Sequence, residues 1–232
     1  MTGHAWPGRV VGGLAPPLTD QADDIDRVWN VFVVIAFGVG ALVAALVAIV
    51  VIRFRRRGDT AALPQQVHEN IPIEVGYTAV PLLIVGGLFA LTVVSIWAVD
   101  DSDADADLLV EVTGFQWQWR FGYPEDGVEV TGSDEVVPEL VLPAGSTVRF
   151  DLTSLDVIHS FWIPGFRFKR DVFPDETTSF QVDVGERTGS FRNTGVCAEF
   201  CGLDHTSMRF SVRVVTSAEF EQWLSEHGSG DG

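Results

Sequence analysis

Residues 28–57 read VWNVFVVIAFGVGALVAALVAIVVIRFRRR. The first twenty-five of them, residues 28–52, carry no charge, and Asn30 is their only strongly polar residue. A helix of this length can cross the hydrocarbon core of a bilayer. The segment is too long for a secretory signal peptide, begins too late in the chain, and has its arginines on the wrong side. We therefore predict a transmembrane helix.

A second apolar run covers residues 75–99 and predicts a second transmembrane helix. The short connection between the two runs holds Arg53, Arg55, Arg56 and Arg57. Because positively charged loops stay in the cytoplasm, this connection is expected inside and both chain termini outside. The predicted organisation is an outer N-terminal segment (1–27), a transmembrane hairpin (28–99) with an inner loop (53–74), an acidic linker (100–107) and an outer domain (108–232).

Charge is divided unevenly between these parts. The chain of 232 residues has a formal net charge of -17, yet 47% of it is hydrophobic. Residues 100–232 hold nine Lys and Arg against twenty-five Asp and Glu, a net charge of -16. Such a surface repels nucleic acid and could steer a cationic partner. The acids are diffuse and Lys169 is the only lysine, which favours adaptation to high salt, in a prokaryotic and halophilic plasma membrane.

Short β-type runs replace the apolar helices after residue 107. They are separated by Gly, Pro and Asp, and cover residues 108–113, 116–121, 139–142, 147–153, 178–184 and 208–215. Many short strands at regular spacing predict an all-β sandwich or barrel. The chain ends in a predicted helix, in which Thr216 and Glu219 can form a capping box and Phe220, Trp223 and Leu224 share one apolar face.

The two cysteines of the chain stand in a twelve-residue segment with other soft ligands. Cys197 and Cys201 are followed by His205 and Met208, and His159 is a further candidate ligand upstream. Thiolates, imidazoles and a thioether suit copper. A disulfide or a zinc site is possible for the cysteine pair, but neither needs the methionine. A single blue-copper ion uses one cysteine, so two copper ions that share both thiolates account better for the second.

The histidines differ in how well they fit a metal site. His159 lies in the apolar segment 156–164, DVIHSFWIP, where a packed core histidine is the simpler interpretation for a lone histidine. Because the cysteine segment needs one more imidazole, we favour His159 as a ligand. His4, His68 and His227 lie in the N-terminal segment, the inner loop and the C-terminal end. We therefore expect only His159 and His205 as ligands.

These residues together resemble subunit II of haem-copper cytochrome c oxidase. The similarity extends over nearly the whole chain: segment 74–81 (EVGYTAVP), segment 114–119 (GFQWQW), segment 159–164 with Lys169 and Asp171 downstream, and C-x-E-x-C-G-x-x-H-x-x-M at 197–208. The resemblance implies a two-helix transmembrane hairpin followed by a cupredoxin-like Greek-key β-barrel or sandwich. Phe161 and Tyr77 stand where the family usually has tryptophan, and neither is an expected ligand.

The resemblance also implies a binuclear copper A centre. Cys197 and Cys201 would bridge both copper ions, and His159 and His205 would each bind one of them. Met208 would be a weak ligand to one copper ion.

Further roles for Glu199, Trp117 and Glu74 follow from the same resemblance. The backbone carbonyl of Glu199 would be a weak ligand to the other copper ion, and its carboxylate would reach a magnesium ion shared with the catalytic subunit. Trp117 would be the point where electrons enter, and Glu74 would lie at the mouth of a proton path. Strand packing is the alternative for Trp117 and Trp119, and an ordinary interfacial carboxylate is the alternative for Glu74.

The resemblance implies an electron-transfer subunit of a respiratory terminal oxidase. It would take electrons from a soluble outer donor, cytochrome c or a small blue-copper protein, and pass them to haem in subunit I for oxygen reduction coupled to proton pumping. This chain alone would not reduce oxygen. The alternatives are a copper-free quinol-oxidase subunit, a nitrous oxide reductase, which needs a large additional catalytic domain, and a membrane-tethered copper carrier.

Overall fold

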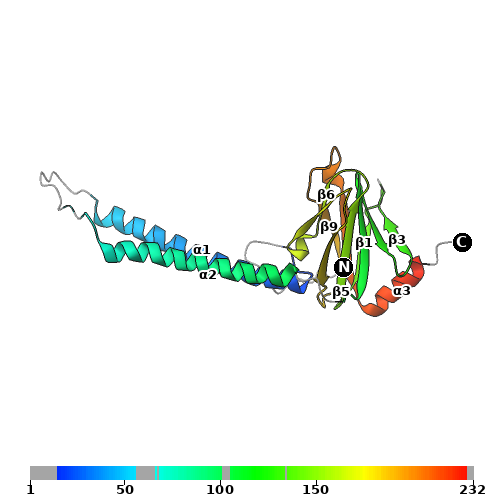
Figure 1. The fold of residues 1–232 in the computed structure, drawn as a ribbon, viewed down its shortest axis with the longest axis horizontal. Helices are drawn as coiled ribbons and strands as arrows, with labels where there is room; N and C mark the ends of the chain where they lie inside the picture. The colour runs from blue at the N-terminus through cyan, green and yellow to red at the C-terminus, as the bar shows by residue number, and fades with distance from the viewer. Residues whose placement is uncertain (1–14, 56–65, 67, 101–104, 134, 229–232) are drawn as a thin grey trace. The chain divides into compact units, whose positions relative to one another are not determined.

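Two long apolar helices precede a β-domain in the computed structural model, which describes residues 15–55, 66, 68–100, 105–133 and 135–228 (Figure 1). Helix α1 spans Asp20–Arg53 and helix α2 spans Ile71–Asp100. The chain divides into a helical unit, Arg27–Ile96, and a second unit made of the residues before and after it, which we call the outer unit after its expected location. Arg56, Arg57, most of the predicted inner loop and residues 101–104 of the predicted linker lie outside the described residues.

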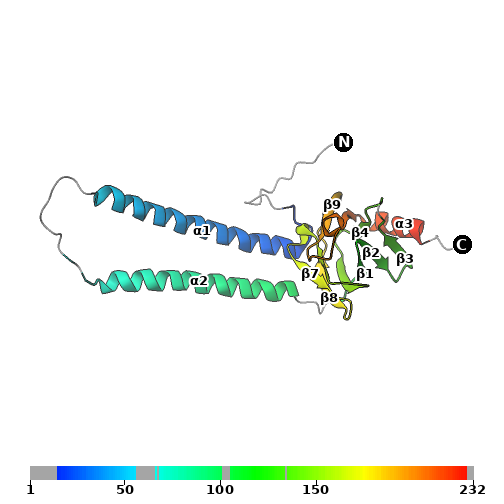
Figure 2. The same ribbon diagram turned by 90° about the horizontal axis from the view of Figure 1, so that it is seen from above.

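Both helices are long and apolar enough to cross a membrane, and they run in opposite directions (Figure 2). Each begins earlier than the apolar pattern predicts, because a polar residue caps it. Thr19 Oγ1 accepts a hydrogen bond from the Ala22 N–H at 3.1 Å, and Asn70 Oδ1 accepts one from the Ile73 N–H at 3.4 Å. Such caps satisfy N–H groups that the first helical turn leaves without a partner.

The outer unit contains two five-stranded sheets. Its strands are β1 (Leu108–Phe115), β2 (Gln118–Tyr123), β3 (Val128–Thr131), β4 (Glu139–Pro143), β5 (Thr147–Ser154), β6 (His159–Trp162), β7 (Lys169–Val172), β8 (Thr178–Asp183), β9 (Gly189–Cys197) and β10 (Arg209–Val215). One sheet has the order β3-β2-β1-β5-β8 and the other β4-β10-β9-β6-β7. The pairs β1–β5 and β4–β10 are parallel, and the others are antiparallel.

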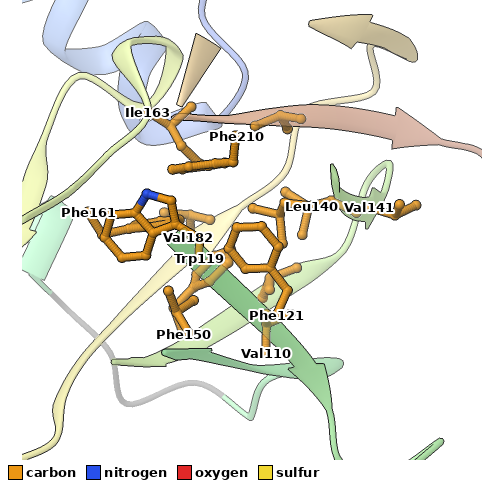
Figure 3. Close-up of a cluster of buried hydrophobic side chains, with 14 of the residues drawn as sticks. Val110, Trp119, Phe121, Leu140, Val141, Phe150, Phe161, Ile163, Val182 and Phe210 are labelled. Atoms are coloured by element: carbon orange, nitrogen blue, oxygen red, sulfur yellow. The ribbon is translucent and has the colours of Figure 1, made fainter. Parts of the chain in front are cut away.

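Alternation along these strands turns every second side chain toward the partner sheet. Figure 3 shows the result, a core in which aromatic rings from different strands meet. Phe161 of β6 stacks on Phe210 of β10 with ring centroids 4.9 Å apart, and Trp119 of β2 packs edge-on against both. The Tyr123 hydroxyl also joins the sheets, because it donates to the Val141 carbonyl and accepts from the Val141 N–H, both at 2.9 Å.

The prediction of an all-β domain with a C-terminal helix is confirmed, with local differences. Helix α3 (Ser217–His227) begins with the capping box of Thr216 and Glu219, and its residues Phe220, Trp223 and Leu224 are buried. The strand predicted over 116–121 was placed two residues too early, because Gln116 and Trp117 form the turn between β1 and β2. Strands β3, β6, β7 and β9 were not predicted.

Candidate metal centre

Two strands and the loop between β9 and β10 bring the candidate ligands together. His159 is the first residue of β6, and Cys197 is the last residue of β9. These strands pair so that Phe161 lies opposite Cys197. Cys201 and His205 follow in the loop, where a short 3-10 helix, η2 (His205–Ser207), turns the chain toward Met208. Residues far apart in the sequence therefore share one end of the sandwich.

The ligand atoms of these residues lie close to one another. The Cys197 Sγ lies 3.9 Å from the Cys201 Sγ and 3.8 Å from the His159 Nδ1. The Cys201 Sγ lies 3.6 Å from the His205 Nδ1 and 3.8 Å from the Met208 Sδ. Both cysteines are free thiols. Atoms bound about 2.0–2.3 Å from one metal ion at tetrahedral angles are roughly 3.3–3.8 Å apart, so these separations suit ligands of a common metal site.

Burial makes this arrangement chemically selective. His159 and Met208 are fully buried, and Cys197 and Cys201 are 6% and 4% exposed. A compact group of soft donors shielded from water favours copper over hard cations such as magnesium or calcium. The ligand atoms of His159, Cys197 and Cys201, one from each residue, all lie within 4.8 Å of one another. The donor set therefore fits the copper expected from the sequence.

The two thiols differ in acidity. Burial opposes ionisation of Cys197, but its hydrogen bond with His159 and backbone hydrogen bonds outweigh burial and lower its pKa to about 7. Burial and the neighbouring Cys197 charge raise the pKa of Cys201 to about 12. Burial also disfavours the charged form of His159, but its contacts with Cys197 and Asp156 raise its pKa above the ordinary value. Metal binding must displace protons from these groups, since thiolate and neutral imidazole are the binding forms.

Asp156 holds the His159 ring in place, a role that the sequence did not indicate. Its Oδ1 lies 2.9 Å from the His159 Nε2, which leaves Nδ1 facing the thiols. The carboxylate is itself fixed, because it accepts from the Gln116 N–H at 2.7 Å and the Val157 N–H at 2.6 Å. Gly114 makes room for the ring, since a Cβ there would lie 3.1 Å from the His159 Cδ2. A carboxylate behind a metal-binding histidine fixes its orientation.

Trp117 contacts the ligand loop directly. Its Nε1–H donates to the Cys201 carbonyl at 3.2 Å, and the Gln116 Nε2 donates to the same oxygen at 2.7 Å. Gly202 allows this approach, because it has a φ of +123° and a Cβ there would lie 3.1 Å from both donor nitrogens. By contrast, Trp119 lies fully buried in the core of the sandwich, so the two tryptophans do not share one packing role.

The remaining candidate residues lie in different places. The Glu199 carbonyl accepts from the Cys197 thiol at 3.2 Å, whereas its side chain is exposed. Glu74 is exposed in the first turn of α2, where its carboxylate accepts from the Asn70 N–H at 2.9 Å. His68 is exposed, His227 binds the Trp223 carbonyl through Nδ1 at 2.8 Å, and His4 lies outside the described residues.

The sandwich, its buried soft donors and the two apolar helices define a membrane-anchored, cupredoxin-like metalloprotein. The chain belongs to the cytochrome c oxidase subunit II family: residues 108–215 match its periplasmic domain and residues 13–96 its transmembrane domain. It is thus a membrane protein and part of an oxidoreductase complex, the haem-copper oxidase, as the resemblance implied.

Individual relatives agree with this assignment. Cytochrome c oxidase subunit 2 of Corynebacterium diphtheriae is 32% identical over 96% of this chain and 75% of its own length. The subunit 2 of Mycobacterium tuberculosis H37Rv is 30% identical over 99% of this chain and 78% of its own length. The crystal structure of the periplasmic domain of subunit II from Bradyrhizobium japonicum is 32% identical, covers 54% of this chain and 96% of that one, and has a TM-score of 0.50.

Proposed function

We propose that this subunit holds a binuclear copper centre that accepts electrons from a soluble donor and passes them to haem in subunit I. The observation that carries the proposal is the convergence of two thiols, two imidazoles and a thioether, with neighbouring ligand atoms 3.6–3.9 Å apart. Copper, when bound, supplies one-electron redox chemistry. Oxygen reduction and proton pumping by the complex, fed by these electrons, belong to the same proposal.

Each candidate side chain would have its own role as a metal ligand. Cys197 and Cys201 would hold the copper as thiolates, and each has one imidazole beside it, His159 or His205. Met208 lies beside Cys201 as a weak thioether ligand, and the Glu199 carbonyl lies beside Cys197. Because these groups are held by strands and by the Asp156 carboxylate, their geometry changes little when charge is added or removed.

Trp117 is the proposed point where electrons enter. It is half-buried, and it is hydrogen-bonded to the backbone of a bridging cysteine, so it lies between solvent and the ligand loop. The donor is cytochrome c or a small blue-copper protein. The exposed Glu199 carboxylate would bind magnesium shared with subunit I, and Glu74 would lie at the mouth of a proton path on the inner side. Both termini and the copper domain then lie outside the cell.

Two alternatives are disfavoured by the site. A copper-free structural subunit, as in quinol oxidases, would have no use for the buried thiol pair beside His159. A copper carrier needs an exchangeable and open site, whereas Cys197, Cys201 and Met208 are buried.

Copper stoichiometry tests the proposal. The full chain, purified in detergent and loaded with copper, is expected to bind two copper ions per chain. The double variant Cys197→Ser/Cys201→Ser is expected to bind none, and Cys197→Ser alone should lose the binuclear spectrum. A ratio of one copper ion per chain, or copper retained by the double variant, would contradict a shared binuclear site.

A further inference from the structure

The residues before the helical unit are built into the outer unit. We call residues 15–26 the strap; its residues 15–19 precede α1, and its residues 20–26 form the first turns of that helix. The Leu18 N–H donates to the Gly165 carbonyl at 2.9 Å, and the Gly185 N–H donates to the Leu18 carbonyl at 3.0 Å. Thr19 forms an antiparallel bridge with Val184. The Leu18 side chain is 4% exposed and fits over Gly165, where a Cβ would lie 2.7 Å from the Leu18 Cγ. Residues 18 and 19 of the strap are thus paired like an additional short edge strand.

Side chains of the strap reinforce this attachment at a second point. Gln21 and Asp183, at the end of β8, bind each other twice: the Gln21 Nε2 donates to the Asp183 Oδ2 at 2.9 Å, and the Asp183 N–H donates to the Gln21 Oε1 at 3.0 Å. Ala22 is fully buried. A merely connecting segment would be hydrated and would not make such reciprocal bonds.

A buried ion pair closes the end of the strap. The Arg167 Nε and Nη2 donate to the two Asp26 carboxylate oxygens at 2.6 and 2.8 Å, and the two side chains are 7% and 9% exposed. The same guanidinium donates to the Pro164 carbonyl at 2.8 Å and to the Ala15 carbonyl at 2.6 Å. Arginine presents its donors in a fixed planar fork, so one side chain can bind both ends of the strap and its own loop at once.

The position of Arg167 gives the pair a mechanical consequence. It follows the short 3-10 helix η1 (Pro164–Phe166) in the loop between β6, which begins with His159, and β7. Asp26 is the last residue of the outer unit before the helical unit starts at Arg27. The loop between β6 and β7 is therefore bound to Asp26, the residue directly before the helical unit. This attachment is additional to the covalent connection from α2 to β1.

We propose that Asp26 and Arg167 are a positioning pair that locks the strap to the outer domain and so fixes the metal-bearing domain for electron transfer to the partner haem. Neither residue contacts a candidate metal ligand in the described contacts. The pair acts through the strap, which opens as a local unit when the pair is broken. This inference rests on the proposed electron-transfer role only for its purpose, and the attachment itself is independent of copper.

Amide hydrogen exchange on the full chain in detergent tests the lock. Breaking a buried ion pair strongly favours the open state, and each tenfold change in an opening constant corresponds to about 1.4 kcal/mol. In Asp26→Asn and Arg167→Gly, the Leu18 and Gly185 amides should exchange roughly 100-fold faster or more, while the core amides of Val110 and Val112 remain unchanged.

Three features sharpen the experiment. Arg167 has a φ of +66°, a conformation that glycine adopts freely, so Arg167→Gly removes the guanidinium without straining the loop. Arg167→Lys keeps the charge but loses the fork, and should give an intermediate exchange rate. Glu221→Gln removes an exposed acid of α3, outside the strap, and is the charge-matched control, with exchange at Leu18 and Gly185 expected unchanged.

A second measurement separates positioning from stability. In the assembled oxidase, electron transfer from the reduced copper centre to the partner haem should slow in Asp26→Asn and Arg167→Gly but not in Glu221→Gln, with the visible spectrum of the centre retained in all three. Unchanged exchange at Leu18 and Gly185, an equal acceleration at Val110 and Val112, or a normal transfer rate in the two lock variants would each overturn the proposal. Copper stoichiometry is unaffected by these variants, so failure here is distinct from failure of the copper assignment.

Discussion

Replacing Asp156 by alanine should weaken copper binding without touching a ligand. The substitution removes the oxygen that lies 2.9 Å from the His159 Nε2. The His159 ring N–H would lose its charged acceptor, and with it the contact that fixes the ring orientation. Loss of such an outer-shell carboxylate typically lowers metal affinity about 10–100-fold, which corresponds to about 1.4–2.7 kcal/mol.

Asp156→Asn provides a graded comparison. Its side-chain oxygen can still accept from His159, but the bond is no longer charge-assisted, and the amide nitrogen cannot accept from the Gln116 N–H as the second carboxylate oxygen does. We expect a loss of copper affinity smaller than in Asp156→Ala, about tenfold or less. Asp204→Ala removes an exposed acid directly before the ligand His205 and should leave the affinity unchanged.

Competition against a copper chelator at constant pH and salt measures these affinities, and circular dichroism verifies that each variant is folded. If folded Asp156→Ala binds copper as tightly as the parent chain, the carboxylate does not hold His159 for the metal. An equal loss in Asp204→Ala would point to the general negative charge of the surface instead.

Further substitutions and conditions test the other assignments. Met208→Leu should retain copper but shift its redox potential, whereas His205→Ala should lose copper. If both variants retain copper equally, His205 is not a stronger ligand than Met208. Trp117→Phe should keep the copper spectrum, because Gln116 still binds the Cys201 carbonyl, but should slow reduction by the soluble donor in stopped-flow experiments; a normal rate in the folded variant removes Trp117 from the path. In the copper-free chain the pKa of His159 is raised, so its contribution to stability is complete below pH 6.5 and is lost as pH rises through its folded pKa. The melting temperatures of the parent and His159→Gln proteins, measured from pH 5 to 9, should therefore converge at high pH. Melting temperature should rise from low to molar potassium chloride as the outer acids are screened, and a flat or falling curve would instead support their use in donor docking.

The sequence predicted those strands in which buried and exposed residues alternate regularly. Strand β5 alternates between buried and less buried residues along its length, as the pattern of residues 147–153 indicated. Strand β9 could not be found in this way. It contains Asn193 with a φ of +50° and a register shift against β10, so its alternation is interrupted.

The same division applies to the site. The spacing of Cys197 and Cys201 indicated a metal site because the two residues are only four positions apart in the sequence. The support behind the ligands depends on contacts across the fold: Asp156 meets the Gln116 N–H 40 residues away, and the Gln116 side chain reaches a carbonyl 85 residues away. Asp26 and Arg167 are separated by 141 positions. No local pattern encodes such pairs, since each residue alone is an ordinary charged or polar residue.

The pairing of β6 with β9 has a consequence for how the subunit matures. His159 and Cys197 are 38 residues apart in the sequence, and the pairing of these two strands brings them together. Because folding brings the two side chains together, we expect copper to bind the native state more tightly than the unfolded chain and to act as a cross-link between the strands. At a free copper concentration 100 times its dissociation constant, this linkage adds about 2.7 kcal/mol to the free energy of unfolding. We therefore expect metal insertion to follow folding of the sandwich, and removal of the metal to require that the pairing of β6 with β9 opens.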